Sequence, residues 1–123
     1  MTNLLVKEII ENGGFTYCLN EWVLKSEGLV YSPFLDRTKV LKIEEMTEEI
    51  LHNYISDNLD KLTLSTSCLG AWHDKETNLV HLDISIIVNC HNEAIQGCIT
   101  HNQLAYYDMA QGKEIYVTQE LVA

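Results

Sequence analysis

The segment Leu79-Val80-His81-Leu82-Asp83-Ile84-Ser85-Ile86-Ile87 carries the clearest structural signal in the chain. Apolar residues occupy its even positions from 80 to 86, and polar residues occupy positions 81, 83 and 85. Because successive side chains of a β-strand point to opposite faces of a sheet, this alternation predicts a strand with one buried and one hydrated face. His81, Asp83 and Ser85 would share the hydrated face, as polar residues do on any exposed sheet.

A hairpin is predicted before this strand and a helix after it. Cys68–His73 is predicted to form the partner strand, joined through a polar turn at residues 74–78. That turn would place His73 beside His81, where two neighbouring histidines could titrate near neutral pH. Asn92–His101 has helical spacing, with an inward face formed by Ala94, Ile95, Cys98 and Ile99.

The remaining segments predict short helices and strands. Residues 3–12 are predicted to form an amphipathic helix that ends at Gly13-Gly14. A second helix is predicted to begin at Thr47, and its inward stripe consists of Ile50, Leu51, Tyr54, Ile55 and Leu59. Strands are expected at residues 15–19, 21–25, 29–34, 38–43, 104–107 and 114–117, and Pro33 marks an edge or an end. Hairpins dominate over βαβ alternation, so we expect an α+β fold with a mainly antiparallel sheet and three short helices. Only the crossover from 79–87 to 104–107 could add a parallel pair.

Length and composition indicate one globular domain spanning residues 1–123. Apolar residues make up 46% of the chain and charged residues 21%, which is typical of a protein with a proper core. The start of the chain carries Lys7 and Glu8 within its apolar pattern and has no cleavage-like site, so no secretory signal is expected. No apolar run approaches a membrane span. The four cysteines are therefore expected to be reduced thiols in a cytoplasmic protein.

The charge balance is strongly acidic, with 18 acidic and 8 basic residues and a net charge of −10. Nucleic-acid binders usually present a basic, phosphate-gripping surface, so direct nucleic-acid binding is disfavoured. The simplest interpretation of the charge is solubility. A sharper interpretation is attraction to a basic partner protein, such as the nucleic-acid groove of a nuclease.

The best candidates for a metal or an enzyme lie in one short segment. Cys90, His91, Cys98 and His101 are zinc-type ligands within twelve residues, but the tight cysteine pair of common zinc sites is absent. Cys98 also falls on the predicted apolar stripe, where cysteine behaves as a small hydrophobe. The sequence contains neither a glycine-flanked serine elbow nor a phosphate-binding glycine loop, and Arg37 is the only arginine. We therefore expect no metal, no cofactor and no catalysis, and a Cys/His metal protein or enzyme stays open as an alternative.

Acidic residues gather around the start and the end of the helix that begins at Thr47. This span contains no basic residue, and its carboxylates belong to Glu44, Glu45, Glu48, Glu49, Asp57 and Asp60. Carboxylates in a first turn favour the positive end of the helix dipole and need no partner to explain them. The functional interpretation is a mimic of phosphate spacing that blocks a basic groove. These six residues are the predicted partner-binding surface.

The C-terminal half resembles a group of small uncharacterised bacteriophage and prophage proteins. The shared pattern, LGAW-D…LDVS…EA…AI-D…GEEI, matches the segments 69–74, 79–85, 92–95, 103–108 and 112–115. Its matching positions are mainly turn and core residues, among them Gly70, Trp72, Leu82, Asp83 and Asp108. The resemblance transfers no activity. It implies an accessory phage protein, and such proteins often act on host machinery by binding.

Three functional hypotheses follow. The leading one is a phage-type accessory protein that binds a host defence nuclease through its acidic surface, in the manner of an anti-CRISPR or anti-restriction protein. The second is a homo-oligomeric interaction module, for example a homodimer. Its aromatic anchors would come from Trp22, Trp72, Tyr106 and Tyr107. The third is the small Cys/His metal protein or enzyme.

Overall fold

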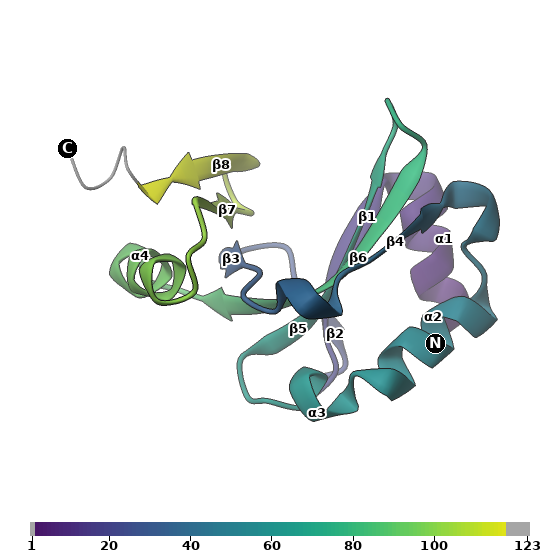
Figure 1. Ribbon diagram of the computed structural model, residues 1–123, viewed down its shortest axis with the longest axis horizontal. Coiled ribbons are helices and arrows are strands. Elements are labelled where there is room, and N and C mark those ends of the chain that lie inside the picture. The colour runs from purple at the N-terminus through teal and green to yellow at the C-terminus, as the bar shows by residue number, and fades with distance from the viewer. Residues whose placement is uncertain (1, 118–123) are drawn as a thin grey trace.

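Strand β6 (Leu79–Val88) organises the sheet of the computed structural model, which describes residues 2–117 (Figure 1). On one edge β6 pairs antiparallel with β5 (Ser67–Asp74), in a register that runs from Asp74↔Leu79 to Ser67↔Ile86. The other edge is shared by two short strands. β4 (Lys39–Lys42) pairs with residues 79–82, and β3 (Leu29–Tyr31) pairs with residues 86–88.

The full sheet has eight strands in the order β2-β1-β5-β6-β3-β7-β8, with β4 on β6. All its pairings are antiparallel. The helix that follows β6 leads to β7, but β3 lies between β6 and β7, so this crossover creates no parallel pair. The remaining strands are β1 (Gly14–Cys18), β2 (Val23–Leu24), β7 (Ala105–Asp108) and β8 (Lys113–Tyr116).

The helices pack on one face of this curved sheet, where they bury two apolar cores (Figure 1). The larger core joins α1, α2 and α3 to Leu82 and Ile84 of β6, and the smaller core joins α4 to Ile86 and Val88 of the same strand. These four side chains alternate along β6 and therefore share a face. The helices are α1 (Thr2–Asn12), α2 (Glu48–Asp57), α3 (Leu59–Leu62) and α4 (His91–Thr100), with 3₁₀ turns η1 (Leu35–Arg37) and η2 (Ile43–Glu45).

The α+β class, the antiparallel sheet and the main helices agree with the sequence predictions. Gly13 and Gly14 adopt positive φ angles of 86° and 150° directly after α1, as expected of a glycine stop. Thr47 caps α2, because its Oγ1 accepts a hydrogen bond of 3.3 Å from the N–H of Ile50. The domain was expected over residues 1–123, of which residue 1 and residues 118–123 lie outside the described part. None of the helices formed by residues 2–117 combines the length and apolarity needed to cross a membrane.

Four local predictions are wrong. The strand expected at 29–34 ends at Tyr31, two residues before Pro33, which has no N–H to donate. The strand expected at 21–25 is reduced to Val23–Leu24. Two residues expected on inward stripes, Leu59 and Ile99, are instead about half exposed. Ile99 follows the buried Cys98 within α4, and helix geometry rotates it by roughly 100°. Leu59 lies beyond the end of α2 at Asp57 and begins the separate helix α3.

The histidine pair expected across the β5–β6 ladder does not form. The turn brings Trp72, not His73, opposite His81, and it places His73 opposite Val80. Because a shift of one residue moves a side chain to the other face, the two histidines point to opposite faces of the sheet. The ring of Trp72 stacks on that of His81 instead, with centroids 4.5 Å apart and planes inclined by 9°.

Candidate functional site

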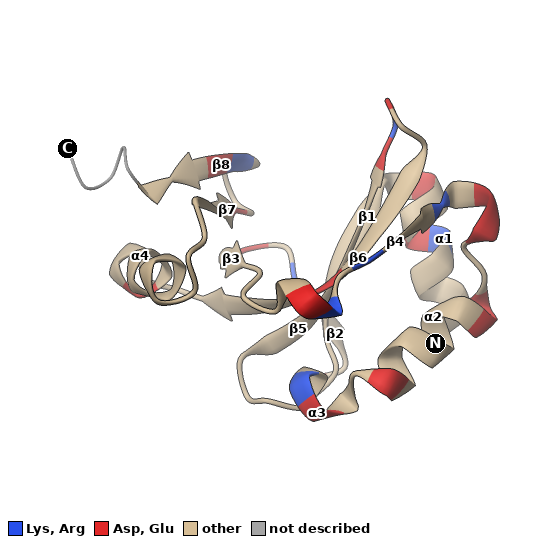
Figure 2. Cartoon of the chain, in the orientation of Figure 1, with Lys and Arg blue, Asp and Glu red and all other residues tan. Residues whose placement is uncertain are grey.

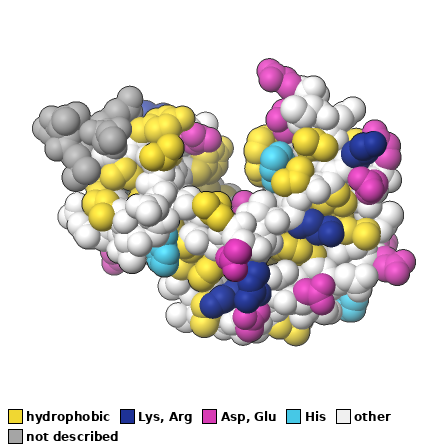
Figure 3. All heavy atoms as spheres, viewed as in Figure 1, with side chains coloured by type: hydrophobic (Ala, Val, Ile, Leu, Met, Phe, Trp, Pro, Cys, Tyr) yellow, Lys and Arg dark blue, Asp and Glu magenta, His cyan; other side chains and the backbone are white. Residues whose placement is uncertain are grey.

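The sheet face opposite the helices is hollowed into a cleft with a volume of about 710 Å³. Figure 3 shows the surface indented between the part of the molecule that carries β7 and β8 and the part that carries the ends of β5 and β6. Residues from β1, β3, β5, β6 and β7 line it, so it follows the concave face of the sheet across both cores. Asp83 and Ser85, two of the three polar residues predicted for the hydrated face of β6, form part of this lining.

Asp83 lies in the cleft at the point where β6 lacks a strand partner on one edge. β4 ends its pairing at Leu82 and β3 begins at Ile86, which leaves residues 83–85 open on that side. The hydroxyl of Ser85 donates a hydrogen bond of 2.8 Å to Oδ1 of Asp83. The hydroxyl of Ser32, just after β3, lies 3.2 Å from that of Ser85. Two hydroxyls and one carboxylate thus form a small polar group lining the cleft.

Gly70 provides the space that this carboxylate occupies. Gly70 pairs with Asp83 across the β5–β6 ladder, and a Cβ built at position 70 would overlap Oδ1 of Asp83. The φ angle of Gly70 is not among the positive ones, so the glycine is needed here for room rather than for backbone conformation.

The contact predicts a coupled pair of substitutions. Gly70→Ala should lower the free energy of unfolding by about 1–3 kcal/mol, because a clash with a buried side chain forces neighbouring atoms to move. In an Asp83→Ala background the same change should be much less destabilising, since the overlapping oxygen is gone. Urea unfolding of the four proteins in this cycle measures the coupling. If the changes in the free energy of unfolding caused by the two substitutions simply added, the two residues would not compete for space.

Burial raises the pKa of the Asp83 carboxyl, and this effect outweighs the hydrogen bonds from Ser85 and Ser32 and the nearby His81, which lower it. The ion pairs among described residues use the carboxylates of Glu11, Glu21, Asp36 and Asp60. Asp83 therefore has no Lys or Arg partner within residues 2–117. An ionised carboxylate buried in this way is destabilising, and such groups are concentrated at functional sites.

The raised pKa sets the pH dependence of Asp83→Asn relative to the unchanged protein. Below about pH 3.9, the ordinary pKa of an aspartate, neither folded nor unfolded protein carries the charge, and the difference in stability between the two proteins is constant. As pH rises further, Asp83 ionises in the unfolded state while the folded state keeps its proton, so the unchanged protein loses stability and the Asn variant does not. The Asn variant should therefore gain relative stability with rising pH, and the gain should level off once Asp83 is ionised in both states. Thermal unfolding between pH 3 and 8 tests this, and a relative gain on acidification would contradict it.

Two aromatic side chains form walls of the cleft. Trp72 of β5 is 48% exposed and Tyr107 of β7 is 43% exposed, and both line the cavity. The stack on His81 holds the indole ring of Trp72 in one orientation. Lys25 and Glu114 also line the cleft. A floor with an unpaired carboxylate and walls with aromatic rings can bind a cationic or hydrogen-bonding group.

The six predicted contact residues lie in two groups along α2 (Figure 2). Four exposed glutamates lie around the start of α2, and we call them the acidic turn: Glu44, Glu45, Glu48 and Glu49. Asp57 ends α2 and Asp60 lies in α3, and both are exposed. At 1.5 Å per residue, the length of α2 separates the two groups by roughly 14 Å. The structure therefore brings four of the six residues together and sets two apart.

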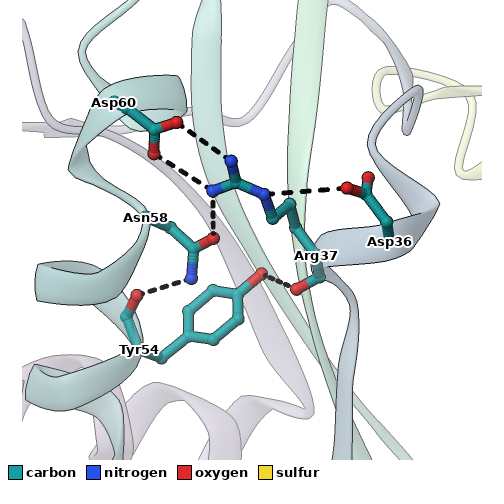
Figure 4. Close-up of polar contacts among 5 residues, drawn as sticks. All are labelled: Asp36, Arg37, Tyr54, Asn58 and Asp60. Atoms are coloured by element: carbon teal, nitrogen blue, oxygen red, sulfur yellow. Dashed lines mark hydrogen bonds and ion pairs between the residues drawn. The ribbon is translucent and has the colours of Figure 1, made fainter.

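Asp60 is an ion-pair partner rather than a free carboxylate (Figure 4). Two nitrogens of Arg37 donate to its two oxygens at 3.0 and 2.9 Å, and these bonds lower the pKa of Asp60. Arg37 also donates to Asn58, at 2.9 Å, and its carbonyl accepts a bond of 2.9 Å from the hydroxyl of Tyr54. These contacts join η1 to the junction of α2 and α3. Arg37 precedes the base-free span in sequence, so only the fold reveals this neutralisation.

The Cys and His residues of the metal alternative have separate partners. Cys98 is buried and its thiol donates to the backbone of β7, at 3.6 Å, while Cys90 is exposed. Nδ1 of His91 shares a hydrogen bond of 2.8 Å with the hydroxyl of Tyr106, and His101 stacks on a tyrosine of β3. Within residues 2–117, no three His, Cys, Asp or Glu side chains are placed to hold a metal ion.

The thiols should differ sharply in reactivity. Burial, together with the neighbouring Cys18, raises the pKa of Cys68 to about 12, and burial raises that of Cys98. A thiolate is the reactive form, so Cys90 alone should react quickly with a disulfide reagent such as DTNB in the native protein. All four should react after unfolding. Rapid labelling that persists in a Cys90→Ser variant would contradict this assignment.

Comparisons of the chain with protein-family models, with curated proteins and with solved structures find no match. The geometry and charge of the chain itself thus support two candidate sites, the cleft and the acidic turn. The cleft contains Gly70, Trp72 and Asp83, which the sequence analysis placed among turn and core positions. The signal that could have singled them out is the polar alternation of β6 opposite a glycine on its partner strand.

Proposed function

We propose that the chain is a phage-type accessory protein that acts by binding a host protein in the bacterial cytoplasm. In its most concrete form, the partner is a host defence nuclease whose basic nucleic-acid groove is blocked, as an anti-CRISPR or anti-restriction protein would block it. The role is binding rather than catalysis. The acidic turn is the contact surface, and Asp57 extends it along α2.

The observation that carries this proposal is the exposure of four glutamates in two consecutive turns, η2 and the first turn of α2. None of them takes part in an ion pair between described residues, although Oε1 of Glu45 accepts a bond of 3.0 Å from the N–H of Lys42. The net charge of −10 adds a long-range field of the same sign. Such a surface speeds association with a basic patch and repels nucleic acid. Asp60 is left out of this surface because Arg37 neutralises it.

Charge reversal of the acidic turn tests the proposal. The tagged protein is used to capture a partner from a host lysate, and the affinity of the purified partner is then measured by biolayer interferometry. Glu45→Lys, Glu48→Lys and Glu49→Lys together should weaken binding at least about tenfold, and salt should weaken binding of the unchanged protein. The partner should also compete with its nucleic acid for the protein.

A matched variant controls for net charge. Glu27, Glu76 and Glu93 are exposed in the structure, and reversing these three makes the same change in net charge. Glu93 lies in the first turn of α4, so it also matches the helix-dipole effect of Glu48 and Glu49. The control should bind as the unchanged protein does. Equal weakening in both triple variants would mean that overall charge, not the acidic turn, governs binding.

One observation favours the homo-oligomeric alternative. Trp22 is 74% exposed at the tip of the β1–β2 hairpin, where it adopts a positive φ of 56°, and the neighbouring Val23 and Leu24 are also exposed. Of the other predicted anchors, Tyr106 is buried in the smaller core. Sedimentation equilibrium separates the two functions: a salt-insensitive dimer that Trp22→Ser converts to a monomer would favour self-association.

A further inference from the structure

We propose that the cleft on the helix-free face of the sheet binds an arginine side chain of the basic partner, with Asp83 as its anionic anchor and Trp72 as its stacking surface. This inference rests on the proposed function, because it assigns a specific contact to the same basic partner. It concerns a different surface from the acidic turn, so the two can be tested apart.

Asp83 brings a carboxylate into the cleft without a basic counter-charge from the described residues. The side chain is partly buried, lines the cleft and has no Lys or Arg partner among residues 2–117. A buried charge without a counter-charge is unfavourable, and a bound cation removes that penalty. An anionic ligand would meet repulsion from Asp83, and a neutral one would leave the charge uncompensated. The chemistry of the cleft therefore selects a cation.

The shape of the lining suits a guanidinium more than an ammonium. Guanidinium is planar, stacks on aromatic faces and carries five N–H donors. Trp72 offers a half-exposed ring backed by His81, so little orientational freedom is lost when a group stacks on it. The hydroxyls of Ser32 and Ser85 lie beside the carboxylate and can accept further N–H bonds. A lysine ammonium lacks the planar fork that uses all of these groups.

The cleft is large enough for an arginine side chain. Its volume of about 710 Å³ lies in the range of pockets that enclose whole ligands, so it has room for an arginine side chain and its flanking peptide. The cleft is open along the sheet face, between Trp72 on one wall and Tyr107 on the other. A protein segment can enter such an opening. The net charge of −10 favours a segment from a basic surface.

The experiment uses the fluorescence of Trp72. The chain has two tryptophans, so Trp22→Phe leaves Trp72 as the single reporter. This protein is titrated with acetyl-Gly-Arg-Gly-amide and with the matching lysine and citrulline peptides. The arginine peptide should change the emission saturably. The citrulline peptide, which keeps the shape but lacks the charge, should bind at least about tenfold more weakly, and the lysine peptide should bind more weakly than the arginine peptide.

Asp83→Asn in the same background tests the anchor. The amide is nearly isosteric, so the variant should fold, which its thermal unfolding verifies, and it should lose at least about tenfold in affinity for the arginine peptide. Glu76→Gln, in the exposed β5–β6 turn, is the matched control and should bind as the parent does. Equal affinity of Asp83→Asn and the parent, equal affinity for citrulline and arginine, or no saturable change up to about 10 mM peptide would each overturn the proposal.

Failure of this inference is distinguishable from failure of the proposed function. If a captured partner depends on the acidic turn but binds Asp83→Asn without loss, and the arginine peptide does not bind, the function stands and the cleft assignment is wrong. If the arginine peptide binds through Asp83 but no basic partner is captured, the cleft assignment stands and the proposed function is wrong.

Discussion

The pairing of β6 along both of its edges is the constraint on which the fold depends. β5 occupies one edge from residue 79 to residue 86, and β4 and β3 divide the other edge between them. The even-numbered side chains of this one strand enter both cores, so all four helices of the described chain are drawn to the same face. The odd-numbered side chains are left on the opposite face, where Asp83 and Ser85 line the cleft. One alternating strand therefore creates both the core and the candidate site.

Sequence patterns predicted the local structure well where the signal is local. The alternation of residues 79–87, the glycine stop after α1 and the Thr47 cap depend on neighbours within a few positions, and each is found as expected. The register error at His73 and His81 shows the limit, since a hairpin of unknown turn geometry leaves the pairing uncertain by one residue. Pro33 indicated that the strand expected at residues 29–34 lies at an edge or ends there. It did not indicate that the strand would end two residues earlier, at Tyr31.

The candidate sites were less predictable because they depend on contacts between distant segments. Asp83 was recognised as a polar strand residue, but its burial depends on Gly70 across the ladder and on Ser32 beyond β3. Likewise, the span from Glu44 to Asp60 contains no base, yet Arg37 pairs with Asp60 once η1 reaches the α2–α3 junction. Periodicity and composition predict which side chains share a face of one helix or strand. They do not predict which faces of different helices and strands pack against each other.

The two separate apolar cores divide the molecule into two packing units. α4, β3, β7 and β8 form one packing unit, and α1 to α3 with β1, β4 and β5 form the other, and the two are joined mainly through β6. Within the smaller unit, Gly97 of α4 approaches the ring of Tyr31 so closely that a Cβ at position 97 would overlap it. Residues 83–85 of β6, which lack a strand partner on one edge, therefore mark the boundary between the two units, and the carboxylate of Asp83 lies at this boundary.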